Sequence, residues 1–273
     1  MLTRIITSLV ALCVLIPVLI FSNTWVFPIA VAIFCAIAVF EALKCVGVIK
    51  KWALSLPLII ASFFGALSGR IFLSVDSWLV TMACIAFAIV LYLMAILVFS
   101  KGKLEVSDVA ISSFISFYIT IGFSSLVLLH DCFENGSIIY ILVFVGAWIT
   151  DIFAYFCGRF FGKHKLIPEV SPKKTIEGSI GGTLFSGIAF VLFGIIVKAL
   201  NFDIGQTHLL QFVFGIVAAV VAQIGDLSMS ALKRKYGIKD FGKLFPGHGG
   251  VLDRFDSIIS VSTVLLILNI LVK

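Results

Sequence analysis

Residues 78–99, WLVTMACIAFAIVLYLMAILVF, form an apolar stretch without a single charged side chain. An α-helix needs about 20 such residues to cross the hydrocarbon core of a bilayer, whereas a membrane β-barrel would show alternating segments of about ten. Similar stretches recur along the chain. The sequence therefore predicts an all-α, polytopic integral membrane protein with about nine transmembrane helices, at residues 5–22, 25–43, 53–73, 78–99, 107–129, 138–158, 179–200, 209–229 and 251–272.

The composition agrees with this prediction. Hydrophobic residues make up 61% of the 273 residues, charged residues only 12%, and the mean hydropathy is +1.21. These values exclude a soluble enzyme and a disordered chain, because soluble domains are about 25% charged. The formal net charge of +6 could indicate nucleic-acid binding. In so apolar a chain, membrane orientation and anionic lipid headgroups explain it better, and we expect no nucleic-acid partner.

The basic residues indicate the orientation. If the predicted helices alternate in direction, 17 of the 20 Lys and Arg residues fall on the side of the N-terminus. Cytoplasmic loops carry such an excess, which predicts a cytoplasmic N-terminus in a multi-pass protein of the cell (inner) membrane. The two long polar loops, 159–178 and 230–250, share this side, and long loops in compact proteins are usually functional or disordered. We expect the active site to face the cytoplasm.

We expect one membrane-embedded domain over residues 1–273. Residues 1–135 would form the membrane body, and residues 136–273 would form a catalytic half that carries both long loops.

Four carboxylates of this half lie in or at the ends of apolar helices: Asp151, Asp226, Asp253 and Asp256. Ionisable groups at membrane depth are costly and are functional candidates by default. Asp253 and Asp256 share one helix face, and Asp226 shares another with Ser230, because residues three or four apart are neighbours on a helix. Two such faces would form the oxygen cage that Mg²⁺ prefers. In the alternative interpretation, each Asp only pairs with a nearby base such as Arg254 or Lys243.

Residues 230–256, SALKRKYGIKDFGKLFPGHGGVLDRFD, combine basic, acidic and glycine residues. The PGHGG turn leads directly into the last predicted helix, whose unpaired backbone N–H groups could accept phosphate oxygens. Arg234 and Arg254 are the better candidates for a fixed phosphate contact, because Arg binds phosphate with a planar fork. A juxtamembrane patch for lipid headgroups is the alternative, but such a patch needs neither glycines nor acids. The role of His248, as acid, phosphate donor or turn residue, stays open.

Residues 171–178, SPKKTIEG, form a third candidate element. Ser171 followed by Pro172 is typical of a helix N-cap and first helical position. This reading places Lys173 and Lys174 in the first turn of the seventh helix, near its positive end, as a second anion site. An ordinary helix cap with orienting lysines is the alternative.

These motifs resemble the phosphatidate cytidylyltransferase (CDP-diacylglycerol synthase) family. Residues 230–256 fit its signature without a gap, and the match extends to Gly225 and Asp226, to 151–162 and to 171–178. The N-terminal five helices resemble the family only in hydropathy and length. The resemblance implies transfer of a cytidylyl group from CTP to phosphatidic acid, with Mg²⁺, a monovalent cation such as K⁺, membrane lipids and a homodimer.

The resemblance also implies roles for individual residues. Asp226, Asp253 and Asp256 would hold metal, and with Lys239 they form the candidate catalytic set. The candidate substrate-binding set is Lys173, Lys174, Ser230, Lys233, Arg234, His248, Gly249, Gly250, Arg254 and Asp151. The nearest alternative is a CTP-dependent kinase of polyprenol or phytol, and from another class a cation transporter. A transporter would spread its acids through the membrane depth, whereas three of these four fall within residues 226–256.

Overall fold

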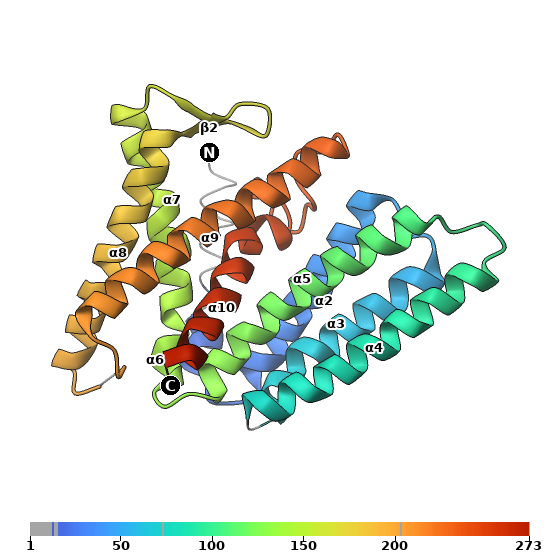
Figure 1. The fold of residues 1–273 in the computed structure, drawn as a ribbon, viewed down its shortest axis with the longest axis horizontal. Helices are drawn as coiled ribbons and strands as arrows, with labels where there is room; N and C mark the ends of the chain where they lie inside the picture. Colours follow the sequence, from blue (N-terminus) through green and yellow to red (C-terminus); the bar gives the residue numbers. More distant parts are fainter. Residues whose placement is uncertain (1–12, 14–15, 73, 203, 273) are drawn as a thin grey trace. The chain divides into compact units, whose positions relative to one another are not determined.

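The computed structural model describes residues 13, 16–72, 74–202 and 204–272 (Figure 1). Eight helical segments in this part of the chain are long and apolar enough to cross a membrane, which confirms a polytopic all-α membrane protein. The first predicted span, 5–22, lies mostly outside the described residues. The helices are α2 (Val26–Val46), α3 (Trp52–Ile71), α4 (Val75–Phe99), α5 (Val106–Asp131), the short α6 (Gly136–Ile139), α7 (Ile141–Phe161), α8 (Ile176–Ala199), α9 (His208–Lys235) and α10 (Leu252–Val272).

The chain divides into two compact units, which we describe separately. The first contains residues 1–132 and 238–254, and the second contains residues 133–237 and 255–273. The first boundary between the units follows Cys132. Most of the second long loop, residues 238–250, belongs to the first unit together with the N-terminal helices.

In the first unit, small side chains let α3 pack closely against α5. A Cβ at Gly65 would lie 2.7 Å from the Thr120 methyl group, and one at Gly69 would lie 2.9 Å from Val127. Hydroxyl groups add hydrogen bonds across the same helix pair, from Thr120 to Ser62 at 2.8 Å. Small residues and interhelical hydrogen bonds are the usual means of helix association in lipid, where no hydrophobic drive acts between helices.

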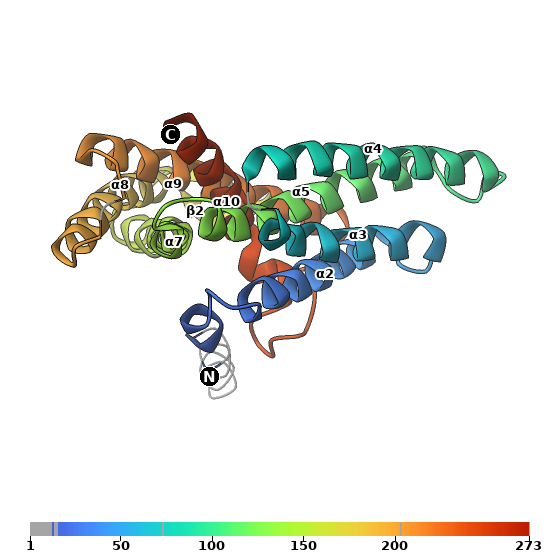
Figure 2. The ribbon, with the colours of Figure 1, turned by 90° about the horizontal axis from the view of Figure 1, so that it is seen from below.

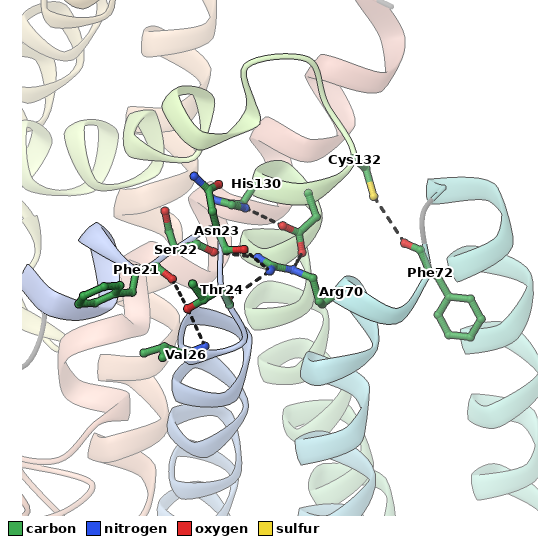
Figure 3. Close-up of polar contacts among 10 residues, drawn as sticks. Phe21, Ser22, Asn23, Thr24, Val26, Arg70, Phe72, His130 and Cys132 are labelled. Carbon is green, nitrogen blue, oxygen red and sulfur yellow. Dashed lines mark hydrogen bonds and ion pairs between the residues drawn. The ribbon is translucent and has the colours of Figure 1, made fainter.

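Arg70, at the end of α3, connects three helix ends of the first unit (Figure 3). Its Nε donates to Asp131 of α5 at 2.5 Å. Its two terminal nitrogens donate to the carbonyl oxygens of Ser22, Asn23 and Thr24, in the turn before α2, at 2.8–3.2 Å. Asp131 also contacts the His130 ring at 2.6 Å. The guanidinium group therefore satisfies carbonyls that have no partner in a helix.

In the second unit, glycines form the contact between α7 and α8, which lie side by side in both views (Figures 1 and 2). A Cβ at Gly182 would lie 2.7 Å from the Thr150 carbonyl oxygen and 3.1 Å from the Ala154 Cβ. Gly187 and Gly215 bring α8 and α9 together in the same way. The tight packing that we expect for the glycine-rich helix is confirmed.

The segment between α7 and α8 forms a β-hairpin, which differs from our expectation. Strand β1 (Lys165–Ile167) pairs antiparallel with β2 (Ser171–Thr175). Helix α8 begins only at Ile176, and its N-cap is Thr175, whose hydroxyl accepts the Gly178 N–H at 3.2 Å. The prediction of a cap at Ser171 with both lysines in the first turn is wrong. Ser171, Lys173 and Lys174 belong to strand β2, and Thr175 is the N-cap of α8.

The contact at Gly182 yields a stability prediction. Replacing Gly182 with Val forces a branched side chain against the α7 backbone, and overpacking of this kind typically costs about 1–3 kcal/mol. We expect a lower unfolding temperature in detergent, followed by tryptophan fluorescence. Leu184→Phe, which adds volume at a 49% exposed position of α8, is the control and should unfold near the wild-type temperature. Equal stability of the two variants would contradict the close helix contact.

Candidate functional site

Residues 238–251, which we call the basic loop, line an open cavity of about 730 Å³ in the first unit together with Arg254. This volume lies within the roughly 300–1,000 Å³ of small-molecule sites. Gly247 and Gly249 have φ angles of 79° and 89°, which permit the tight turn that pairs Phe245 with Gly249. The polar lining combines residues of the basic loop with the start of α10: Lys239, Asp240, Lys243, His248 and Arg254. The cavity therefore offers cations and backbone turns, a set suited to a phosphorylated ligand.

Asp253, in the first turn of α10, stabilises the conformation of the basic loop. Its Oδ2 accepts the N–H of Phe241 at 2.8 Å and the N–H of Gly250 at 2.9 Å, and the residue is 7% exposed. A carboxylate that accepts backbone N–H groups holds them more strongly than a neutral acceptor does. Asp253 thus connects Phe241 and Gly250 of the loop through hydrogen bonds. Its metal-binding role stays a prediction.

Glu41 of α2 binds the beginning of α10 in the same unit. Its two carboxylate oxygens accept the N–H of Val251 at 3.2 Å and the N–H of Leu252 at 2.9 Å, and Glu41 is only 5% exposed. The sequence predicts that the N–H groups at this helix end are available for phosphate. That expectation is wrong for Gly250, Val251 and Leu252, because Asp253 and Glu41 already accept their hydrogens.

Glu41 is not among the residues predicted from the sequence, although a signal for it is present. Glu41 is the one acid in the predicted span 25–43. The rule that singled out the four aspartates, that a carboxylate within an apolar helix needs a partner or a function, applies to it equally. No sequence pattern connects it to a loop some 200 positions away.

The second unit brings together three of the predicted aspartates. Asp256 of α10 lies within electrostatic range of Asp226 of α9 and Asp151 of α7, and of the Lys233 ammonium group. Lys233 is 8% exposed, and a buried ammonium group beside carboxylates offsets part of their repulsion. These residues form a mixed cluster with more acids than bases.

Lys174, at the end of β2, pairs with Asp226 across the same unit. Its Nζ lies 2.5 Å from Asp226 Oδ2, and both side chains are about one quarter exposed (22% and 24%). Lys174, which the sequence places in a second anion site, is therefore directed at a carboxylate in this structure. Its neighbour Lys173 is exposed.

Asp226 and Asp256 are the carboxylates of this cluster that a divalent cation could use. In the described part of the chain, no three His, Cys, Asp or Glu side chains form a group that could hold a metal by themselves. Mg²⁺ is commonly bound by only one or two carboxylates, with water and substrate phosphates completing its shell. A Cβ at Gly225 would lie 2.8 Å from the Asp256 carbonyl oxygen, and glycine at this position lets α9 and α10 approach each other. Two carboxylates are the number that Mg²⁺ commonly takes from a protein, and a Mg²⁺ site at Asp226 and Asp256 stays a prediction.

The other predicted residues lie at the end of α9 and in the basic loop. Ser230 is half-buried and follows Asp226 by about one helical turn. Arg234, Lys239 and Arg254 are exposed, as expected of groups that meet a ligand from water. Gly249 and Gly250 belong to the turn that Asp253 holds.

Comparison with known proteins covers nearly the whole chain. A model of the cytidylyltransferase family matches residues 2–272. A protein of Staphylococcus saprophyticus named phosphatidate cytidylyltransferase is 36% identical over 273 residues, which are 98% of each chain. Proteins of the same name are 34% identical over 98% of each chain in Staphylococcus haemolyticus, and 38% identical over 63% of this chain and 64% of the relative in Staphylococcus aureus strain COL.

The ion pair between Lys174 and Asp226 yields a binding prediction. Lys174→Ala removes a positive charge beside Asp226, so the affinity for a divalent cation should rise by roughly three- to tenfold. Mn²⁺ binding, followed by electron paramagnetic resonance of the purified protein, measures this change. Lys173→Ala is the matched control, because it removes an exposed charge from the adjacent position, and it should change the affinity little. An unchanged or weaker affinity in Lys174→Ala would show that Asp226 is not a cation ligand.

Proposed function

Because the chain belongs to the cytidylyltransferase family, we propose that it transfers the cytidylyl group of CTP to phosphatidic acid, giving CDP-diacylglycerol and pyrophosphate. The cavity of the basic loop carries this proposal, because Lys239, Lys243 and Arg254 line it and suit a triphosphate. The names of relatives that align with 98% of the chain support the same activity.

The proposed reaction exchanges one bond for another. An oxygen of the lipid phosphate forms a bond to the α-phosphorus of CTP, and the bond from this phosphorus to the bridging oxygen breaks as pyrophosphate leaves. The lipid phosphate is already an anion, so no strong base is needed. The main obstacle is repulsion between two anionic substrates, and fixed cations lower it. Arg254, with its planar fork, and the loop lysines are placed to neutralise phosphate oxygens in this way.

The carboxylates supply the second part of the proposal. We assign Asp226 and Asp256 as ligands of Mg²⁺, with Asp253 as a further candidate. Mg²⁺ held there would neutralise charge on the attacking and leaving phosphate oxygens. Lys174 and Lys233 limit the repulsion among these acids while no metal is bound. K⁺ and a homodimer belong to the proposal through the family resemblance alone.

The location of the reaction follows from its substrates. The spans form a multi-pass membrane protein. Phosphatidic acid would approach within the membrane with its acyl chains among the spans, while CTP would arrive from water. The excess of Lys and Arg on the side of the basic loop supports a site that faces the cytoplasm.

Labelled CTP tests the proposed activity. Purified protein in mixed micelles with phosphatidic acid, CTP and Mg²⁺ should move label from α-³²P-CTP into the organic-soluble lipid, and should not move it from γ-³²P-CTP. A CTP-dependent lipid kinase would give the reverse pattern. Lipid that stays unlabelled with both substrates would contradict any CTP-dependent modification of phosphatidic acid, and EDTA should abolish the transfer.

Substitution of the carboxylates tests their assignment. Asp226→Asn and Asp256→Asn keep the side-chain shape but remove a negative charge, and we expect cytidylyl transfer to fall by at least about a hundredfold, as for loss of a major electrostatic contribution to catalysis. Asp76→Asn, at an exposed acid in the first turn of α4, is the control and should keep the wild-type rate. Near-normal turnover in either cluster variant, with the protein still inserted in the membrane, would refute its role as a ligand.

A further inference from the structure

Glu41 acts on α10 from a distant part of the chain. The first N–H groups of a helix have no partner within the helix, and a nearby Ser, Thr, Asp or Asn usually satisfies them. For α10, a carboxylate 211 positions away accepts the Leu252 N–H, and its other oxygen accepts the Val251 N–H. The negative charge also lies at the positive end of the helix dipole, which favours this placement. Glu41 therefore caps α10 from another helix.

The surrounding backbone leaves room for this carboxylate only because two residues lack side chains. A Cβ built on Gly242 or on Gly250 would collide with the Glu41 carboxylate group, and the Cβ on Gly242 would also lie 3.1 Å from the Gly250 Cα. Neither glycine has a positive φ angle, so the close approach, not the backbone conformation, explains glycine here. Two parts of the basic loop, at Gly242 and Gly250, thus meet at one carboxylate.

This contact fixes the part of the chain that lines the cavity. Asp253 holds Phe241 and Gly250, Glu41 holds Val251 and Leu252, and the cavity-lining residues Lys243 and His248 lie between these anchors. The anchored N–H groups are directed at carboxylates, so contacts with an anion fall to the side chains of the loop. A small rotation of α10 or of the loop would misplace these side chains.

We propose that Glu41 is a positioning residue for substrate binding, which holds the basic loop and the start of α10 in the geometry that presents the cationic side chains to the nucleotide. The inference rests on the proposed cytidylyl transfer for its consequence in catalysis. The contact itself is independent of that activity and can be tested without it.

Hydrogen exchange of the purified full-length protein tests the contact. In Glu41→Gln, the new amide group can accept only at its oxygen, and its NH₂ group faces a second N–H donor. We expect peptides from residues 241–254 to exchange at least about tenfold faster, with the other spans unchanged, because a lost acceptor favours local opening. Glu134→Gln, at an exposed acid between α5 and α6, is the matched control and should exchange like the wild type. Wild-type exchange of 241–254 in Glu41→Gln would overturn the proposal.

Steady-state kinetics tests the consequence for substrate binding. The loop side chains contact the nucleotide before and during the reaction, and loss of uniform binding raises KM more than it lowers kcat. We expect kcat/KM for CTP to fall by roughly ten- to a hundredfold in Glu41→Gln, mostly through KM. A fall through kcat alone, or no fall, would overturn the positioning role. If the wild type makes no CDP-diacylglycerol, the proposed function fails, while the exchange experiment still decides whether Glu41 holds the loop.

A double substitution separates positioning from general damage. Gly242→Ala alone should reduce kcat/KM, because its methyl group displaces the Glu41 carboxylate. In a Glu41→Ala background the space is open, so adding Gly242→Ala should cost at least about fivefold less than it does alone, which is the coupling expected of residues in contact. Equal costs in both backgrounds would show that the two residues act independently and would overturn the proposal, even if each variant is less stable.

Discussion

A carboxylate within an apolar helix must be stabilised by hydrogen bonds or by an opposite charge, and this requirement organises both units of the protein. In the first unit, Glu41 and Asp253 meet backbone N–H groups at the start of α10 and so determine the path of the basic loop. In the second unit, Asp226 meets the ammonium group of Lys174 and so connects the hairpin to α9. These carboxylates would destabilise the fold if they had no partner. With their partners they connect helices and loops.

The two units solve this requirement with different chemistry. Backbone N–H groups are fixed in direction by the helix, so carboxylates that accept them serve as rigid structural anchors. A lysine ammonium group on a flexible stem can move away when another cation arrives. For this reason the proposed metal ligand Asp226 has a partner that could give way to a metal ion.

The sequence predicted those features that depend on neighbouring residues. Eight of the expected spans coincide with long apolar helices, because the hydropathy of a helix is a property of about 20 consecutive residues. The family signature in residues 230–256 and the acids of α9 and α10 are also predictable, because they too lie within short stretches of consecutive residues. Periodicity correctly placed Asp226 and Ser230 on one helix, but it could not predict that Asp253 would be directed at Phe241 and Gly250.

Features that depend on distant residues were missed. The contacts of Glu41 join positions 41 and 252, and no local pattern encodes them. The hairpin at 165–175 was mistaken for a helix start, because Ser171 and Pro172 are typical of such a start while the competing partner, β1, is a short strand of three residues. Thr175 is also a favourable N-cap residue, and strand pairing decided between the two.

The hairpin has a consequence for how the sequence of this region can change. Along β2, Lys173 is exposed while the next residue, Lys174, is directed at Asp226, because successive side chains of a strand point to opposite faces. Insertion of one residue within β2 would exchange these two faces and turn the partner of Asp226 toward water. Insertions in the turn at residues 168–170 leave the strand register intact. Length variation should therefore be tolerated at the tip of the hairpin and excluded from its second strand.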